Sequence, residues 1–521
     1  MARSLYLINP AVDFPTYFGG EVFAQGGRPA AEIVADLSLP TVAAMVPPGI
    51  HLEFCNENVT TVDFERPVDV VGLTGKVSQQ RRMFAIADEF RRRGKTVLIG
   101  GPFASLSPEV VRAHCDVLVQ GELEGVAGEL FSDLEQGTLR ADYAGERPDL
   151  SATPVPRWDL YPNERTLMGA VQTSRGCPFE CEFCDVIPYV GRKQRTKSVG
   201  QILAELDTLY GIGYREVFFA DDNFSASRRF AKELLAALAG WNARRAHGRM
   251  GFMTELSIDG ARDDELLDLI AASGMRKVYM GIETPNLEGL KETRKRQNLV
   301  GDLVELVHRF YERGVAVFAG MIVGFDADRA GIFEWQFEFA EASSIPIFTL
   351  GTLVAPDRTP LAARMQKEGR LLDRSTSVTA APWSTNIQPQ HMSLDEQLQG
   401  MKWLANSLYH PDRFGERVLA LLDKLAPLPG AGTVDRSWGG HHIGSLRTDV
   451  QIILARVARR GEAEMRMLGR VRKALERRPE ATSLIMPMIL TYAQVRHMYD
   501  QGQFWDPHVR SPQGSAVALS V

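Results

Sequence analysis

Two series of short apolar runs that alternate with helix-like segments constrain the fold of this chain more than any other feature. In the first series, runs rich in Val, Leu and Ile are separated by helix-like segments. The clearest of these segments, 78–94, ends in an Arg cluster and Gly94. Because strands that alternate with helices pair in parallel, residues 1–145 are predicted to form a doubly wound, Rossmann-like α/β domain. Its predicted strands are 5–9, 51–55, 68–75, 96–101 and 116–122.

Small residues follow three of these strands, at the edge where parallel sheets of this kind bind ligands. A single loop of this type is explained by a turn of the chain, but three on one sheet favour an edge that a large ligand approaches closely. The chain has no G-x-G-x-x-G motif, so a dinucleotide is not the favoured ligand. The candidate ligand-binding residues are Thr74, Gly75, Gly100, Gly101, Pro102, Gly121 and Glu122.

A Pro-rich segment, 146–167, is predicted to be a linker, and a second βα series follows it across 168–374. Six strand-like runs alternate there with five helix-like segments. This pattern predicts a partial, TIM-like βα barrel with its chemistry at the carboxyl ends of the strands. The predicted strands are 169–174, 216–222, 251–256, 277–283, 316–324 and 348–353, and the helices lie near 198–210, 227–240, 263–273, 300–313 and 331–342.

The strand pattern stops beyond about residue 375, so residues 375–521 are predicted to form a helical domain. Ser393 and Glu396 have the spacing of a capping box at the start of a helix. The segment 448–478 is apolar at helical spacing, with Arg and Lys on its other face.

Length and charge exclude several classes of protein. A chain of 521 residues is too long for one core and suggests about three domains. The net charge of -6 gives no general reason to expect nucleic acid as a partner. The first apolar run is too short for a secretory signal, and no apolar stretch approaches the roughly 20 residues needed to span a bilayer, so a cytoplasmic location is expected.

Three of the five cysteines lie within positions 177–184, directly after the first predicted barrel strand. Cys177, Cys181 and Cys184 can supply three thiolates to a [4Fe–4S] cluster and leave its fourth iron open. The alternatives are a structural zinc site or a redox pair, but zinc normally takes four N or S ligands and no histidine lies nearby. Cys55 and Cys115 lie in or beside strands of the N-terminal domain, where buried Cys behaves as a small hydrophobic residue.

The spacing C-x3-C-x-aromatic-C, with Phe183 as the aromatic residue, resembles the signature of the radical S-adenosylmethionine (SAM) enzymes. The resemblance implies that SAM binds the open iron and that an electron from the cluster cleaves a C–S bond to give a radical. It also implies which residues hold SAM, with Glu283 on the ribose hydroxyls and the fifth strand beside adenine. These residues are Asp222 and Asn223 after the second strand, Glu255 at the third, Gly281, Ile282 and Glu283 at the fourth, and Gly320 and Gly324 at the fifth.

The resemblance extends over nearly the whole chain. The N-terminal domain is similar to the cobalamin-binding domain of a large radical SAM class, and the helical tail is similar to that of hopanoid methylases. This implies a cobalamin-dependent methyltransferase that acts on an unactivated carbon. The D-x-H-x-x-G motif that places a histidine on cobalt in some cobalamin proteins is absent, since His51 and His114 lack its Asp and Gly. The resemblance therefore implies cobalt without a protein histidine.

Other functions are weighed against this one. A radical SAM enzyme without cobalamin would catalyse a rearrangement, coupling, oxidation or another group transfer from SAM. An RNA methylthiotransferase needs three further cysteines in its N-terminal domain, which here has two. A non-catalytic iron–sulfur or corrinoid carrier has no need of a nucleoside pocket.

The resemblance also implies partners. The expected partners are a small-molecule or lipid-like substrate and an electron donor such as flavodoxin or ferredoxin. The apolar segment 483–493 raises the expectation of a weak membrane association, against the simpler interpretation that its helix packs on its own domain.

Overall fold

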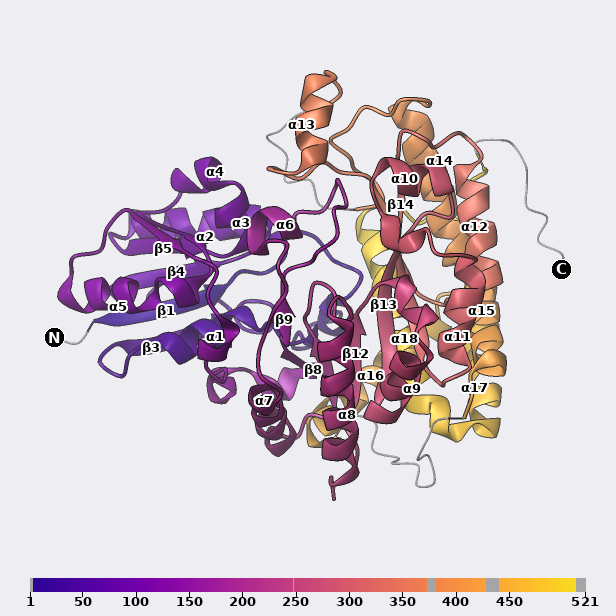
Figure 1. The fold of residues 1–521 in the computed structure, drawn as a ribbon, viewed down its shortest axis with the longest axis horizontal. Helices are drawn as coiled ribbons and strands as arrows, with labels where there is room; N and C mark the ends of the chain where they lie inside the picture. The colour runs from indigo at the N-terminus through magenta and orange to yellow at the C-terminus, as the bar shows by residue number, and fades with distance from the viewer. Residues whose placement is uncertain (1–2, 247, 373–380, 428–439, 512–521) are drawn as a thin grey trace. The chain divides into compact units, whose positions relative to one another are not determined.

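The computed structural model describes residues 3–246, 248–372, 381–427 and 440–511 of the chain (Figure 1). The chain divides into two compact units, Met1–Pro178 with Asp185–Asp222, and Phe179–Cys184 with Asn223–Val521. The division passes through the cysteine loop. Cys177 therefore belongs to the first unit, whereas Cys181 and Cys184 belong to the second.

The first unit contains a six-stranded parallel sheet in the order β3-β1-β4-β5-β6-β7. All five predicted strands are present in this sheet, and its short sixth strand, β7, was missed. The strands are β1 (Ser4–Asn9), β3 (His51–Asn56), β4 (Val70–Thr74), β5 (Thr96–Gly100), β6 (Val117–Gly121) and β7 (Asp142–Gly145).

Both faces of this sheet are covered, as the doubly wound fold requires. On one face, Met83, Ile86 and Phe90 of α2 (Gln80–Arg92) pack in a core cluster with Ile8. On the other, Leu130 of α5 (Ala127–Gln136) packs in a separate cluster. The remaining helices of the unit are α1 (Ser38–Met45), α3 (Pro102–Leu106), α4 (Pro108–Arg112), α6 (Val186–Val190) and α7 (Val199–Ile212).

The first unit also contains the start of the second βα series. There, β8 (Thr166–Val171) pairs in parallel with β11 (Glu216–Phe219) and with β2 (Glu32–Val34). A two-stranded antiparallel ribbon joins β9 (Ser174–Arg175) to β10 (Arg195–Thr196). The segment predicted as a linker contains short 3-10 helices and buries Leu150, Trp158 and Tyr161.

The second unit continues the series with four parallel strands in the order β15-β14-β13-β12. The strands are β12 (Gly251–Glu255), β13 (Met275–Glu283), β14 (Ala316–Val323) and β15 (Phe348–Thr352). The helices before, between and after them are α8 (Arg228–Ala243), α9 (Asp264–Ser273), α10 (Leu287–Glu292), α11 (Leu303–Tyr311), α12 (Ile332–Ser343) and α13 (Pro360–Lys367). All six predicted barrel strands are present, and the partial βα barrel is confirmed.

The end of the described chain is helical, as predicted. The capping box is confirmed, since the Ser393 N–H donates to Glu396 Oε2 at 2.7 Å and the Glu396 N–H donates to Ser393 Oγ at 3.1 Å. The segment 448–478 contains parts of two helices, because the first ends at Ala458 and the second begins at Glu462, after Gly461. The helices are α14 (Leu394–Leu408), α15 (Pro411–Lys424), α16 (Gly440–Ala458), α17 (Glu462–Arg477) and α18 (Thr482–Gln501).

The apolar segment 483–493 lies inside α18, and its large side chains are buried within the described protein. Leu484, Ile485, Met488 and Ile489 are each at most 1% exposed. The simpler interpretation of this segment, packing on its own domain, is therefore the one the structure supports. Within the described ranges, no helix is both long enough and apolar enough to span a bilayer.

Candidate active site

The segment that leads into Cys177 is held by two consecutive carboxylates after β11. Asp221 Oδ1 accepts the backbone N–H groups of Thr173 and Ser174 at 2.7 and 2.8 Å, and its Oδ2 accepts the Thr173 hydroxyl. Asp222 Oδ2 accepts the Gly176 N–H at 2.7 Å. Burial raises the pKa of Asp221 to about 6, against the lowering effect of these hydrogen bonds. The two carboxylates thus fix the backbone immediately before the first cysteine.

Gly176 itself cannot be replaced without moving this loop. Its φ is +100°, and an added Cβ would lie 2.5 Å from the Lys193 carbonyl oxygen. The Cys177 N–H donates to the Gly191 carbonyl at 3.2 Å, which closes the loop against the residues after α6. The geometry therefore gives Asp222, which was predicted to contact SAM, an additional contact with the cysteine loop.

The other two cysteines lie in a segment that is held within the second unit. The Glu182 N–H donates to the Thr293 carbonyl at 3.0 Å, and the Glu182 carboxylate pairs with Arg364 at 2.8 Å. The Phe183 ring packs on Phe325, with the ring centroids 6.2 Å apart. Cys181 itself is buried.

Glu283 ends β13 in an unusual backbone conformation, with φ at +62°. Its Oε1 lies 2.6 Å from Lys295 Nζ, and the two side chains are 8% and 13% exposed. Burial lowers the pKa of Lys295, but the charges of Glu283, Cys181 and Cys184 outweigh it and raise the pKa. Gly281 makes room for this pair, since a Cβ there would lie 2.3 Å from Glu283 Oε1 and 2.8 Å from Lys295 Nζ.

Four buried amide oxygens around the ends of β13 and β14 have no hydrogen-bond partner among the described residues. Their amide nitrogens are engaged on the protein in three of the four cases, on Cys181 Sγ, on the Gly281 and Ile282 carbonyls, and on the Ile322 carbonyl. Such orphaned acceptors are costly unless a ligand with N–H or O–H donors satisfies them. They belong to Gln297, Asn298, Gln336 and Gln397.

The predicted glycines on β14 and after it face side chains from other elements of the same unit. A Cβ at Gly320 would lie 2.6 Å from the Tyr279 hydroxyl, which is hydrogen-bonded to Thr349. Gly324 has φ at +117°, and a Cβ there would lie 2.9 Å from the Gln397 amide nitrogen. Gln397 comes from α14, so the helical domain contributes a side chain to this edge.

Three other predicted site residues lie at strand ends of the second unit in different surroundings. Asn223 donates to Ser257 Oγ at 2.6 Å. Glu255 ends β12 with an exposed side chain, and its carbonyl accepts the Phe224 N–H at 2.9 Å. The Ile282 side chain is fully buried, so only its backbone faces Asn298.

The residues of the predicted ligand edge of the N-terminal sheet lie at and after the ends of β4, β5 and β6. Gly101 and Gly121 have φ at +93° and +76°, and Pro102 begins α3. Added Cβ atoms would strike the protein itself, at Thr74 Oγ1 for Gly101 and at the Gly145 carbonyl for Gly121. These two glycines are therefore required by the turns, whatever approaches the edge. At Gly75 and Gly100 the nearest protein atoms lie at 3.2 and 3.3 Å.

An ion network that the sequence did not reveal joins this edge to the cysteine loop within the first unit. The Glu122 carboxylate is 2% exposed and pairs with Arg175, two residues before Cys177, and with Arg195. Arg175 also binds Glu124 at 2.7 Å. Arg and Glu far apart in sequence carry no spacing signal, which is why this contact could not be predicted.

The other two cysteines lie in the core of the first unit. Cys55 and Cys115 are buried and free, and burial raises the pKa of both thiols. Within the described part of the chain, no three His, Cys, Asp or Glu side chains are grouped so as to hold a single metal ion. Cysteines of a cubane cluster bind different irons and need not converge on one point.

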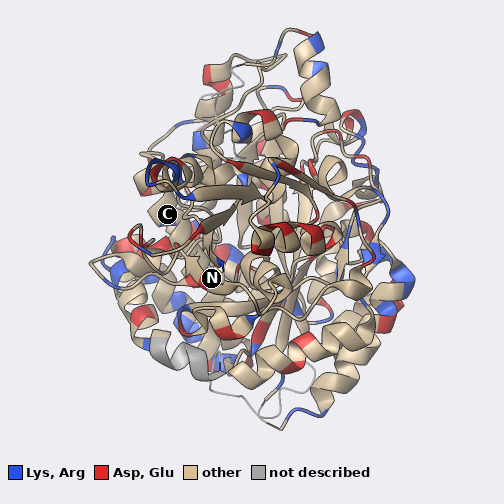
Figure 2. Ribbon diagram, turned by 90° about the vertical axis from the view of Figure 1, so that its left-hand side faces the viewer, with Lys and Arg blue, Asp and Glu red and all other residues tan. Residues whose placement is uncertain are grey.

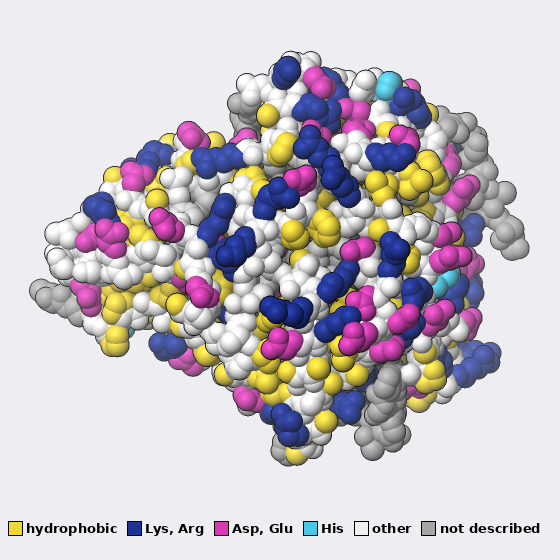
Figure 3. All heavy atoms as spheres, in the orientation of Figure 1, with side chains coloured by type: hydrophobic (Ala, Val, Ile, Leu, Met, Phe, Trp, Pro, Cys, Tyr) yellow, Lys and Arg dark blue, Asp and Glu magenta, His cyan; other side chains and the backbone are white. Residues whose placement is uncertain are grey.

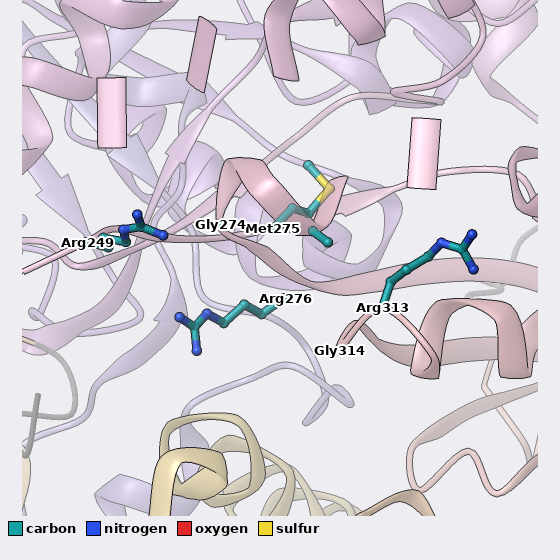
Figure 4. A pocket seen from close by; sticks show the side chains of 7 residues that line it. Arg249, Gly274, Met275, Arg276, Arg313 and Gly314 are labelled. Carbon is teal, nitrogen blue, oxygen red and sulfur yellow. The ribbon is translucent and has the colours of Figure 1, made fainter. Parts of the chain in front are cut away.

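A small pocket lies at the opposite end of β13 from Glu283 (Figure 4). It surrounds Met275, the first residue of that strand, about 26 Å of extended chain away. The pocket is therefore separate from the candidate site. Its lining residues are Arg249, Ala271, Gly274, Met275, Arg276, Arg313 and Gly314.

Charged side chains of both signs are interleaved along the helices (Figure 2) and over the face drawn in Figure 3. On that face, lysines and arginines alternate with aspartates and glutamates rather than forming one broad basic area. This distribution agrees with the modest net charge of the sequence.

Comparison with known proteins agrees with the geometry. Residues 171–332 match the model of the radical SAM superfamily, and residues 359–503 match a domain of unknown function, DUF4070. The chain is 39% identical over 348 residues to an uncharacterized methyltransferase of Synechocystis sp., covering 66% of this chain and 65% of that protein. It is 32% identical over 371 residues to the hopanoid C-2 methylase of Rhodopseudomonas palustris, covering 69% of this chain and 70% of that protein. The matches thus span about two thirds of these relatives.

Two solved structures share the fold. The cobalamin-dependent SAM radical enzyme OxsB, with aqua-cobalamin bound, superposes with a TM-score of 0.60 at 14% identity, over 96% of this chain and 80% of that one. The radical SAM methyltransferase TsrM from Kitasatospora setae, with cobalamin and a [4Fe–4S] cluster bound, gives 0.56 at 18% identity, over 71% and 75%.

The fold and the cysteine loop thus define a radical SAM protein. Within that superfamily, the chain belongs to the family of the hopanoid C-2 methylase.

Proposed function

We propose that this protein is a cobalamin-dependent radical SAM methyltransferase that acts on an unactivated carbon of a small-molecule or lipid-like substrate. One observation carries the proposal above the others. The loop with Cys177, Cys181 and Cys184 is fixed by Asp221 and Asp222 in one unit. In the other unit, Gln297 donates its amide N–H to Cys181 Sγ. Its amide oxygen is one of four orphaned acceptors of this unit, and such acceptors suit a nucleoside.

The residues fit the three groups that this function needs. Cys177, Cys181 and Cys184 would hold three irons of a [4Fe–4S] cluster, a role for which thiolates are the usual ligands. Glu283 would accept the ribose hydroxyls of SAM, and the orphaned amide oxygens would accept its N–H donors. The glycine-rich edge at Thr74, Gly75 and Gly100 would face a corrin. When bound, these groups would supply a hydrogen-abstracting radical and a methyl donor.

The chain's own residues prepare the site for this chemistry. Asp221 and Asp222 hold the backbone before Cys177, so the loop needs little reorganisation when a cluster assembles. Phe183, which lies between Cys181 and Cys184, packs on Phe325, and these two rings would help to exclude water from a radical formed there. Glu122 and Arg175 tie the corrin-facing edge to the same loop.

The substrate class rests on the relatives. Hopanoid methylases are named for a lipid substrate, and a bacteriochlorophyllide d C-12(1)-methyltransferase of Chlorobaculum tepidum is 26% identical over 354 residues. The expected electron donor is a flavodoxin or ferredoxin. The main alternative is a radical SAM enzyme with a cobalamin-free N-terminal domain, which would rearrange, couple or oxidise its substrate or transfer another group from SAM to it.

Replacing Glu283 with alanine is expected to weaken SAM binding at least tenfold while leaving the iron content of the reconstituted protein unchanged. The carboxylate accepts two hydroxyl donors, and hydrogen bonds to a charged group contribute about 1.5–3 kcal/mol. The measurement is SAM affinity by equilibrium dialysis on anaerobic, cluster-loaded protein. Glu288→Ala, an exposed carboxylate on α10, is the matched control. Wild-type affinity for SAM in the Glu283→Ala variant would show that Glu283 does not contact SAM.

A further inference from the structure

The segment 293–298 of the second unit, between α10 and α11, contacts the cysteine loop. Gln297 donates its Nε2 hydrogen to Cys181 Sγ at 3.3 Å and is 6% exposed. Thr293 accepts the N–H of Glu182, the residue after Cys181, at 3.0 Å. The segment is therefore bound to the cysteine loop both by a side chain and by the backbone.

Lys295 of the same segment carries a positive charge beside these thiols. Its Nζ lies 5.9 Å from the centroid of the Phe183 ring, the residue between Cys181 and Cys184. The same Nζ is 2.6 Å from Glu283 Oε1. Because both side chains are largely buried, water screens this charge poorly, and its effect on the nearby thiolates is larger than that of a surface lysine.

We propose that Lys295 and Gln297 raise the reduction potential of the iron–sulfur cluster and so make its reduction by the electron donor easier. This inference rests on the proposed function, because it requires that Cys181 and Cys184 ligate the cluster. Lys295 and Gln297 are positioning residues, since each acts through the cysteine ligands rather than on the substrate.

The direction of the shift in reduction potential follows from charge. Reduction adds one electron to the cluster and its thiolates, so a nearby positive charge or an N–H donor to sulfur stabilises the reduced state more than the oxidised state. Glu283 opposes this effect, but its contact with Lys295 holds the lysine in place. Removal of Lys295 leaves the buried Glu283 carboxylate uncompensated, which shifts the potential further in the negative direction.

The experiment is a redox titration of the cluster in the full-length, reconstituted protein without SAM, followed by electron paramagnetic resonance of the reduced cluster. Lys295→Met keeps the length of the side chain and removes its charge. We expect its midpoint potential to become more negative, so that at the wild-type midpoint much less than half of the cluster is reduced. Lys295→Arg keeps the charge and should restore most of the wild-type potential.

Two further variants separate this effect from damage to the fold. Arg296→Met removes an exposed charge one residue away and should leave the potential nearly unchanged, because solvent screens that charge. Gln297→Leu removes only the hydrogen bond to Cys181, and we expect a smaller negative shift. If Lys295→Met fails to fold, the reduction potential of the Gln297→Leu variant still tests the proposal.

The outcomes distinguish this inference from the proposed function. A wild-type protein that assembles no cluster would overturn both. A wild type with a full cluster and SAM cleavage, together with Lys295→Met and Gln297→Leu variants of unchanged potential and full iron content, would overturn this inference alone.

Discussion

Alanine in place of Cys177, Cys181 or Cys184 is expected to abolish the iron–sulfur cluster and, with it, the cleavage of SAM. Each thiolate would hold a different iron, and the two other cysteines of the sequence cannot replace a lost one, since Cys55 and Cys115 lie buried in the core of the N-terminal sheet. Loss of one ligand therefore leaves two irons without protein thiolates. The measurement is iron and sulfide per chain after anaerobic reconstitution, with 5′-deoxyadenosine formation as the readout of cleavage.

The controls for this prediction are Cys55→Ala and Cys115→Ala. Both thiols pack within the apolar cluster on one face of the N-terminal sheet, and both variants should retain the full iron content and SAM cleavage. A small loss of thermal stability is expected, because each change removes a buried sulfur. A triad variant with wild-type iron content and cleavage would refute the assignment of the cluster ligands.

Changing Asp221 to alanine is expected to remove most of the cluster without touching a cysteine. The carboxylate accepts two backbone N–H groups, from Thr173 and Ser174, which are at most 1% exposed. An unsatisfied buried N–H costs about 1–3 kcal/mol, so the loop would leave its present conformation. Cluster content and the near-ultraviolet circular dichroism of the apo protein are the measurements.

Asn is the matched variant at this position. Because Asp221 Oδ1 accepts both N–H groups, an Asn oxygen can replace it, and the Asn amide can donate to the Thr173 hydroxyl. Asp221→Asn should therefore retain most of the cluster while Asp221→Ala loses it. Equal cluster content in the two variants would show that these hydrogen bonds do not hold the loop.

Most of the fold could be predicted because its strands are buried on both faces and are continuous in apolar residues. The strands of the partial barrel and those of the N-terminal sheet both have this signal. The missed strands β2 and β7 are three and four residues long, and β7 reads Asp-Tyr-Ala-Gly, which has no apolar run. Length, rather than position in the fold, decided which strands could be found.

The site could be predicted in part. The cysteine spacing and the residues Gly281 to Glu283 are local in sequence, and a pattern can find them. Lys295 and Gln297 reach the cysteine loop only through the folded chain, as do Asp221 and the Glu122 network. Gln397 comes from a different domain of the sequence. Long-range side-chain contacts leave no spacing pattern, so they had to be located in the structure.

The central claim is tested most directly by the cofactor content of the intact protein. The chain is produced with hydroxocobalamin available, purified without oxygen, and measured for iron, sulfide, cobalt and corrin absorbance. We expect about four irons and four sulfides per chain, together with one corrin whose spectrum shows no histidine on cobalt. An intact cluster that cleaves SAM in a protein that binds no corrin would contradict the methyltransferase proposal and favour the cobalamin-free alternative.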